Sequence, residues 1–391
     1  MASDASAQCH YQTVVLGAEE LCGGAQPASM FPWSLNEFGQ VVGDFACGIG
    51  FSRPFVWRGD GPLVEVPVPL DFQSGTAFDI SEGGTIVGGL MIGGGRFKGP
   101  VGFLFADRVM TVLEPLPGGD TVCAHAVNDA QQVVGFWGDT GSGSPLSGSM
   151  AFLWDDGVML DLAPDLGTMS SDAYDINDAG QVVGWMGVSI LLDGRAFIWD
   201  DGVVIDLGPV PDGVSSFAFA INDVGQVVGQ GQVPEDGTTF GRGRGFLWDN
   251  GAMSSVGVLP GFENSRATDV NNRCLVVGTC WGGSPTSGYV WHDGVMHDLN
   301  DLTSSPERIT DVSGVNDSGS ILARLGGNGV ALLVPIDPPA ADVTGDCAVD
   351  HRDLQFVIDA WGRSESVGDL DGDGEVGFGD LLRVLSGWTA P

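Results

Sequence analysis

The sequence has few basic residues: 15 Lys and Arg stand against 51 Asp and Glu, for a formal net charge of −36. A nucleic-acid-binding protein needs a cationic face that displaces counterions from phosphates, and no basic cluster is present to form one. Anionic membrane surfaces are disfavoured for the same reason. Calcium, cationic partners and neutral glycans are compatible with this charge, which would also keep an exported protein soluble and monomeric.

Long apolar runs are absent too. No run approaches the roughly 18–20 residues that a membrane span needs, so we predict no membrane insertion. No C-x-x-C pair occurs, which argues against a zinc site or a redox dithiol. Among the seven cysteines, the candidate disulfides by proximity are Cys9 with Cys22 and Cys274 with Cys280, and the odd total leaves at least one thiol free or intermolecular.

The first residues, MASDASAQCHYQ, contain neither a basic segment nor an apolar segment of the kind found in an export signal. We interpret the chain as a secreted or cell-surface protein whose signal has been removed. Catalytic motifs are also missing: the sequence has no G-x-S-x-G, no H-E-x-x-H and no phosphate-binding glycine loop. The sequence therefore does not predict an enzyme.

One ten-residue phrase recurs seven times. Its anchor residues are spaced 45, 47, 49, 45, 49 and 45 residues apart, in the phrases SLNEFGQVVG, DISEGGTIVG, AVNDAQQVVG, DINDAGQVVG, AINDVGQVVG, DVNNRCLVVG and GVNDSGSILA; the anchors are Asn36, Ser81, Asn128, Asn177, Asn222, Asn271 and Asn316. A second phrase such as AFLWDDGVMLDL follows in each unit except the last. Four short strands in about 45 residues, joined by Asn-Asp-x-Gly and Asp-Asp-Gly turns, are typical of a propeller blade.

The two ends of the repeat region complement each other. The last unit, which ends in VALLVPID, supplies only three strands, and YQTVVLG at residues 11–17 resembles the missing fourth. We therefore predict an all-β, seven-bladed propeller over residues 1–336, with four-stranded blades and an N-terminal strand that closes the last blade. Closure of this kind leaves no unpaired strand edge at the seam between the ends.

The phrases AFLWDDGVMLDL and AYDINDAGQVVG resemble the HAF repeats of exported bacterial proteins over roughly residues 11–336. That family is defined by its repeat, so the resemblance implies the propeller and an extracellular location but no reaction. Tryptophans at positions 57, 154, 199, 248 and 291 recur at one repeat position and are predicted to pack between blades. Trp137, Trp185 and Trp281 vary between units and are better candidates for an exposed patch.

After a linker at residues 337–341, two twelve-residue loops carry oxygen donors in the spacing that wraps one calcium ion. In the first loop the predicted ligands are Asp342, Thr344, Asp346, Ala348 through its carbonyl, Asp350 and Asp353. In the second they are Asp369, Asp371, Asp373, Glu375 through its carbonyl and Asp380. The sequence therefore predicts Ca²⁺ as the cofactor, bound at two sites.

A helical stretch follows each loop, DLQFVIDAW and DLLRVLSGW, with one face formed by Leu354, Val357, Ile358 and Trp361 and the other by Leu381, Leu382, Leu385 and Trp388. A loop followed by a helix, twice, with Asp at loop position 12, resembles a type I dockerin over about residues 340–390. The resemblance implies a small all-α, EF-hand-like domain at residues 342–391 and a cohesin-like or other protein partner.

Two positions depart from the dockerin pattern. Cys347 stands at loop position 6, where glycine makes the sharp turn, so the second site is the better formed. The residues at positions 10 and 11, which in dockerins recognise the cohesin, are His351 and Arg352 in one loop and Phe378 and Gly379 in the other. They differ from each other and from the usual hydroxylated pair, which puts cohesin binding in doubt.

Three functions fit these observations. The first is a non-catalytic, calcium-binding recognition or scaffold protein, in which the propeller binds a glycan or protein ligand and the C-terminal module docks onto a partner. The second is an extracellular polysaccharide-active hydrolase or lyase, which requires carboxylates that converge in the propeller channel or a surface cleft. The third is a self-associating structural or adhesive protein. The Asn-Asp pairs at 128–129, 177–178 and 222–223 either form turns only or also form a carboxylate ring on one face.

Overall fold

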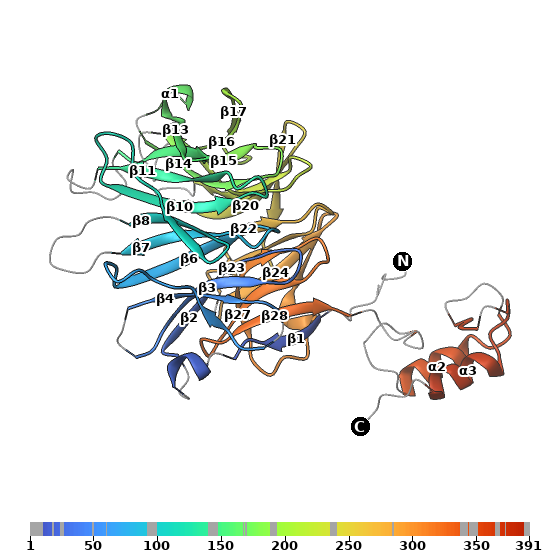
Figure 1. Cartoon of the computed structure of the whole chain (residues 1–391). Helices are drawn as coiled ribbons and strands as arrows, with labels where there is room; N and C mark the ends of the chain where they lie inside the picture. Colours follow the sequence, from blue (N-terminus) through green and yellow to red (C-terminus); the bar gives the residue numbers. More distant parts are fainter. Residues whose placement is uncertain are drawn as a thin grey trace. The chain divides into compact units, whose positions relative to one another are not determined.

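The computed structural model describes residues 11–17, 19–23, 27–48, 51–59, 61–91, 100–139, 148–166, 168, 170–187, 194–234, 241–283, 285–336, 343, 351–363, 368–371 and 373–386. Most of the chain, Val14–Asn300 with Pro306–Leu333, forms one compact unit, and the C-terminal segment belongs to a second. Within the first unit, seven four-stranded sheets follow one another along the chain (Figure 1). No described helix is both long and apolar enough to cross a membrane.

The strands of each blade are given in order from the innermost, next to the central channel, to the outermost. Blade 1 contains β2 (Ser29–Leu35), β3 (Val41–Ala46), β4 (Arg53–Trp57) and β5 (Val64–Glu65). Blade 2 contains β6 (Ser74–Ile80), β7 (Ile86–Met91), β8 (Val101–Ala106) and β9 (Val109–Val112). Blade 3 contains β10 (Thr121–Val127), β11 (Val133–Gly138), β12 (Met150–Asp155) and β13 (Val158–Asp161). Blade 4 contains β14 (Ser170–Ile176), β15 (Val182–Gly187), β16 (Arg195–Asp200) and β17 (Val203–Gly208).

Blade 5 contains β18 (Ser215–Ile221), β19 (Val227–Val233), β20 (Arg242–Asp249) and β21 (Ala252–Gly257). Blade 6 contains β22 (Asn264–Val270), β23 (Val276–Trp281), β24 (Ser287–His292) and β25 (Val295–Asp298). Blade 7 contains β26 (Ile309–Val315), β27 (Ile321–Leu325), β28 (Val330–Pro335) and β1 (Tyr11–Val15). Short helices join some blades: η1 (Glu19–Cys22), α1 (Ala163–Leu166) and η3 (Leu299–Asp301). The C-terminal segment contains α2 (His351–Asp359) and α3 (Phe378–Ser386).

Blade 7 confirms the predicted closure. Its sheet order is β1-β28-β27-β26, so the N-terminal strand is the outermost strand of the last blade. The backbone N–H of Leu16, just after β1, donates to the carbonyl of Val330 at 2.9 Å. The last blade is thus built from both ends of the repeat region, and seven four-stranded antiparallel blades are present as the sequence predicts.

The glycine of the recurrent Val-Val-Gly phrase lies beneath an aromatic ring. In blade 2, Gly88 pairs with Phe103 on the neighbouring strand, and a Cβ atom on Gly88 would approach the Phe103 ring to 2.8 Å. The other blades except the seventh repeat this pairing, and the seventh has Ala323 opposite Ala331 instead. Where the glycine is replaced by alanine, the aromatic residue opposite it is also replaced by alanine. The paired change keeps the volume between the two adjacent strands similar.

The tryptophans behave in two ways. Trp57 and Trp199 are buried, and Trp154 and Trp248 pack against the core clusters between blades, as predicted for repeat-equivalent residues. Trp185 contradicts the prediction of an exposed patch, because only 1% of its surface is accessible. It lies on β15, where its ring packs 6.1 Å from that of Phe217 in the next blade.

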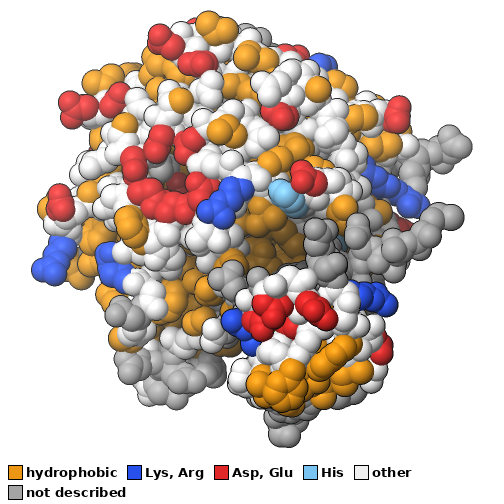
Figure 2. Space-filling view, turned by 90° about the vertical axis from the view of Figure 1, so that its right-hand side faces the viewer, with side chains coloured by type: hydrophobic (Ala, Val, Ile, Leu, Met, Phe, Trp, Pro, Cys, Tyr) orange, Lys and Arg blue, Asp and Glu red, His pale blue; other side chains and the backbone are white. Residues whose placement is uncertain are grey.

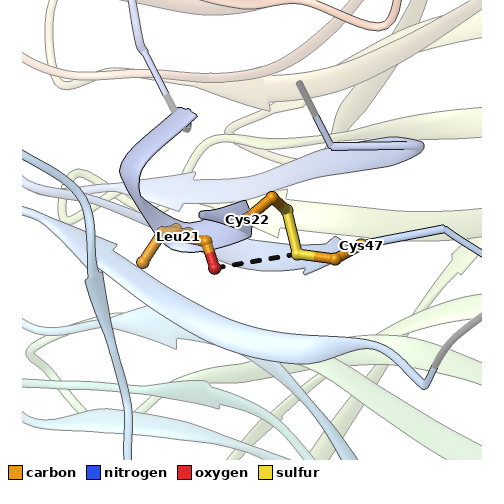
Figure 3. The surroundings of a disulfide bond; sticks show 3 residues. All are labelled: Leu21, Cys22 and Cys47. Atoms are coloured by element: carbon orange, nitrogen blue, oxygen red, sulfur yellow. Dashed lines mark hydrogen bonds between the residues drawn. A yellow bond between two sulfur atoms is a disulfide. The ribbon is translucent and has the colours of Figure 1, made fainter. Parts of the chain in front are cut away.

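The predicted disulfides are wrong. Cys22 pairs with Cys47, linking η1 to the end of β3 (Figure 3). Cys274 and Cys280 are reduced: Cys274 lies in the turn before β23 and Cys280 near the far end of that strand. The extended strand between them, at about 3.3 Å per residue, holds the two thiols beyond the reach of a disulfide. Cys123 is also reduced and buried. Cys9 and Cys347 lie outside the described residues.

The C-terminal helices enclose a small core. It consists of Val343, Val357, Ala360, Val376 and Val384, with Leu354, Leu370 and Leu381 packed against it. The predicted helical faces are therefore partly wrong. Ile358, Trp361, Leu382 and Leu385 are 45–50% exposed, whereas Leu354, Val357 and Leu381 of the same predicted faces belong to or pack against the core.

Candidate functional site

The second predicted calcium loop brings its first three carboxylates together. One carboxylate oxygen from each of Asp369, Asp371 and Asp373 lies within 4.8 Å of the other two. Gly374, at loop position 6, has a φ of +94°, the left-handed conformation that the sharp turn of a calcium loop requires. Glu375, the predicted carbonyl ligand, is exposed. The donor set and the turn both fit a hard cation such as Ca²⁺.

Asp380, at loop position 12, lies at the start of α3. It is buried, and its carboxylate accepts backbone N–H groups from Gly377 at 2.7 Å and Asp371 at 3.0 Å. The bond to Gly377 is the reciprocal half of a capping box, in which the third helical residue returns to the N-cap. Burial alone would raise the pKa of Asp380, but the backbone donors outweigh it and lower the pKa.

The first loop falls mostly outside the described residues. Asp342, Thr344, Asp346, Ala348 and Asp350 are not described, so their predicted role stays a prediction. Asp353 is described: it is the third residue of α2 and fully buried. It thus has the same place in α2 that Asp380 has in α3.

A second candidate site is the central channel of the propeller, a pocket of about 330 Å³. The residue after each anchor lies at its mouth, which gives Glu37, Glu82, Asp129, Asp178, Asp223, Asn272 and Asp317. In the space-filling view, acidic side chains encircle a hollow (Figure 2). We call these seven residues the mouth ring.

A continuous set of hydrogen bonds runs around the mouth ring. In each blade a turn N–H donates to the ring side chain of the next blade, for example Asp129 to Asp178 at 2.9 Å and Asp178 to Asp223 at 3.0 Å. The set closes from blade 7 to blade 1, where Asp317 donates to Glu37. The Asn-Asp pairs therefore form turns and also converge as a carboxylate ring.

The anchor asparagines form a second ring just below. Asn128, which is buried, holds its own turn through Gln132 and donates from its side chain to the carbonyl of Asn177 in the next blade at 3.1 Å. Asn177, Asn222, Asn271, Asn316 and Asn36 repeat this link around the channel. Buried amides satisfied on both sides explain why asparagine, rather than any turn former, occupies the anchor.

A β-bulge in each innermost strand directs further side chains into the channel. In β6 the register with β7 shifts between Ala77 and Asp79, so Phe78 is the extra residue. Both Phe78 and Asp79 consequently line the pocket. The same shift occurs at the equivalent position of the other innermost strands.

Three carboxylates lie deeper, at alternating blades. Asp79, Asp175 and Asp269 accept backbone N–H groups of Val127, Ile221 and Val315 in the following blade, each at 2.8 Å. Burial raises the pKa of all three, in the case of Asp269 to about 6, and repulsion from the other two adds to the rise for Asp175. Each aspartate therefore braces one pair of blades.

The mouth ring contains titratable groups with raised pKa values. Burial raises the pKa of Glu82 to about 7, and the charges of Glu37, Asp129 and Asp178 add to the effect. Burial also raises the pKa of Glu37. Below the ring, burial would lower the pKa of His125, but the Asp172 carboxylate 3.3 Å away raises it well above its ordinary value. The channel is thus a region of concentrated negative charge.

Sequence reasoning did not find the whole channel site. It weighed three Asn-Asp pairs but missed Glu37, Glu82 and Asp317, which occupy the same repeat position. A further signal lies two residues before each anchor, where aspartate alternates with a small residue from blade to blade. The residues at this position are Ser34, Asp79, Ala126, Asp175, Ala220, Asp269 and Gly314. Only the bulge shows that these side chains face the channel.

Comparison with known proteins supports the fold. A family described as a protein of unknown function (DUF3466) matches residues 167–323, and a search of curated proteins found no match. The chain is similar to Pyrococcus horikoshii acylaminoacyl peptidase, with 13% identity over 79% of this chain and 51% of that one, at a TM-score of 0.50. A prolyl endopeptidase shares 10% identity over 80% and 51%, at a TM-score of 0.52.

The chain spans about half the length of these two peptidases. At such low identity the similarity concerns the fold alone. The chain is therefore a seven-bladed β-propeller protein with a small helical C-terminal region.

Proposed function

We propose that this protein is a secreted, calcium-binding recognition protein of the HAF-repeat type, with the propeller as its binding platform and a dockerin-like C-terminal module. The observation that carries the proposal is the cluster of Asp369, Asp371 and Asp373 around a loop whose sixth residue has a positive φ. Clustered carboxylates repel one another until a cation lies among them, so calcium binding should be coupled to ordering of the module.

Exposed apolar side chains support a docking role for the module. On and beside α2 and α3, they are Phe356, Ile358, Trp361, Phe378, Leu382 and Leu385, each 38–65% exposed. Exposed apolar patches of this kind are typical of protein interaction sites. A cohesin-like protein is one candidate partner, although the residues at loop positions 10 and 11 differ from the dockerin pattern.

The disulfide supports export. Cys22 and Cys47 are bonded, and structural disulfides form and persist in oxidising compartments outside the cytosol. The proposal therefore places the protein in the extracellular space or on the cell surface.

Calcium titration by calorimetry tests the proposal. We expect the full chain to bind two ions, and a chain that ends at residue 336 to bind none, because all predicted ligands lie beyond it. The variant Asp369→Asn/Asp373→Asn should lose the second site, because it replaces two of the three clustered carboxylates.

The matched control is Asp156→Asn/Asp201→Asn, which removes the same charge from exposed hairpin turns of the propeller. Asn250 has the same left-handed conformation at the equivalent turn position, so the control should fold. Absence of calcium binding to the full chain would contradict the proposal. Binding that persists after truncation would show that the propeller itself holds calcium.

A polysaccharide-active enzyme is the second candidate, favoured by one observation: carboxylates do converge in the channel. It ranks lower because the mouth-ring side chains occupy equivalent repeat positions and accept backbone hydrogen bonds from the preceding blade. This arrangement already accounts for their presence. Release of reducing ends or unsaturated products from glycans by the wild type, lost in Glu82→Gln, would favour the enzyme.

The third function, self-association through an unpaired thiol, has little support among the described cysteines. Cys123 and Cys280 are buried, and burial raises the pKa of Cys280 to about 11, so its reactive thiolate is scarce at neutral pH. Burial also raises the pKa of the partly exposed Cys274.

A further inference from the structure

The channel pocket combines two features that the calcium-binding role does not use. Its lining contains nine carboxylates and, among the described residues, neither lysine nor arginine; the nine are Glu37, Asp79, Glu82, Asp129, Asp175, Asp178, Asp223, Asp269 and Asp317. Its volume of about 330 Å³ falls within the range of small-ligand sites. A pocket of this charge attracts cations.

The second feature is a belt of aromatic side chains directly below the mouth ring. The bulge positions of five consecutive blades hold Trp33, Phe78, His125, Tyr174 and Phe219, all of which line the pocket. Neighbouring rings are in contact, with centroids 5.2 Å apart for Trp33 and Phe78 and 5.9 Å for Tyr174 and Phe219. Blades 6 and 7 have Thr268 and Ser313 at this position, so the belt covers one side of the channel.

The spacing of the carboxylates disfavours a bare metal ion. Within the described part of the chain, only Asp369, Asp371 and Asp373 bring three ligand atoms close enough to hold one. Calcium needs six to eight oxygens around a single point, whereas the mouth ring distributes its oxygens around a pocket. Aromatic faces are likewise poor metal ligands but attract ammonium and guanidinium groups, which they contact through the ring quadrupole.

On one side of the mouth ring, two carboxylates each have an oxygen that accepts no hydrogen bond from a described residue. The deep aspartates have both oxygens engaged by backbone or hydroxyl donors. Asp129 and Asp178 each accept one hydrogen bond, at Oδ1, and their second oxygens accept none from any described residue. These two residues belong to blades 3 and 4, whose bulge residues His125 and Tyr174 stack at 5.4 Å below them.

We propose that the channel mouth binds an extended organic cation, an alkylammonium or guanidinium chain, between the free oxygens of Asp129 and Asp178 and the Tyr174 and Phe219 rings of the aromatic belt. The inference rests on the proposed function only in taking the propeller as the binding platform. The cation enters through the mouth ring, and its charged group lies between the free oxygens of Asp129 and Asp178 and the faces of Tyr174 and Phe219. The rest of its stem extends back toward the mouth. A free polyamine and a Lys or Arg side chain of a peptide both have this chemistry.

The test is calorimetry on the full chain in EDTA at low salt, with spermidine and the peptide Gly-Arg-Gly as probes. EDTA removes calcium, so failure here is separate from failure of the calcium site. We expect at least one probe to bind, and Asp129→Asn/Asp178→Asn to weaken it about tenfold, or about 1.4 kcal/mol. Tyr174→Leu should weaken it several-fold by removing a ring.

The aspartate variant is designed to preserve the fold. Asn272 occupies the same ring position in blade 6 and accepts the N–H of Asp223 at 2.8 Å, so asparagine can replace the structural hydrogen bond. The control Asp156→Asn/Asp201→Asn removes the same charge from exposed turns and should leave binding within about twofold of wild type.

Each outcome decides something. Binding of spermidine alone identifies a polyamine site, and binding of the peptide alone identifies a site for a protein side chain. Equal weakening in the channel variant and in the control would reduce the effect to net charge and overturn the proposal. Absence of binding to both probes at millimolar concentration, or unchanged binding in Tyr174→Leu, would also overturn it.

Discussion

Individual residues of the repeat each make two structural contacts, one within their own turn or strand and one with a neighbouring strand or blade. Asn128 closes its own turn and bonds the next blade. Gly88 makes room both for the Phe103 ring and for the carbonyl of Thr76 in the bulged strand. A residue that serves a turn and an interface together is constrained in size as well as in conformation, which accounts for the near-invariance of these positions among the seven copies of the repeat.

Substitution of Gly88 by alanine tests this constraint. The added methyl group meets backbone on one side and the Phe103 ring on the other, so we expect the free energy of unfolding to fall by about 1–3 kcal/mol. Urea denaturation followed by tryptophan fluorescence measures the change. Gly17→Ala is the matched control, since nothing lies within 4 Å of the added atom, and equal effects of the two substitutions would contradict the packing argument.

At the scale of elements, β1 completes blade 7 while the chain after it is bonded to blade 1. Leu16 is buried beside β28, and Cys22 in η1 is linked to Cys47 at the end of β3. The N-terminal segment therefore contacts both the last and the first blade. Without β1, the backbone edge of β28 would be unpaired and open to association with another chain.

Deletion of residues 1–17 should destabilise the propeller and promote aggregation. Loss of the buried Tyr11 and Leu16 side chains costs about 3 kcal/mol or more. Denaturation midpoints and light scattering on a sizing column measure the two effects. The chain truncated after residue 336 is the control, which should keep the wild-type midpoint of the propeller. A monomeric deletion variant with an unchanged midpoint would show that β1 is dispensable for closure.

At the scale of the whole molecule, the channel concentrates negative charge on one axis. The folded state raises the pKa of Glu82 to about 7 and that of Asp269 to about 6. Between the ordinary pKa of a carboxyl group, near 4, and these raised values, the folded state binds more protons than the unfolded state. Stability should therefore fall as the pH rises through this window.

We expect the propeller to unfold at a higher temperature at pH 5.5 than at pH 8 in EDTA. Scanning calorimetry at the two values measures the difference. Glu82→Gln should reduce the difference, because it removes the mouth-ring carboxyl group whose pKa is raised to about 7, whereas Asp201→Asn in an exposed turn should preserve it. A propeller that is more stable at pH 8 would contradict this charge distribution.

Part of the fold could be predicted because its signals are local. The anchor spacing set seven blades, period-two alternation and Asn-Asp-x-Gly turns set four strands in each, and the missing strand of the last unit indicated that residues 11–17 would complete it. The close approach of Asp369, Asp371 and Asp373 could be predicted in the same way, since these residues alternate along one short loop. Short sequence separation makes such geometry depend on the local backbone alone.

The sequence by itself therefore determined the number of blades, their closure and the form of the C-terminal loop. The tertiary structure alone decided that Cys22 bonds Cys47, that Trp185 is buried, and that seven residues about 45 positions apart form one ring around a channel. It also decided which helical faces are buried. These features depend on contacts between blades, and such contacts follow from the curvature of the closed ring and from a bulge in every innermost strand, neither of which is encoded in any single segment.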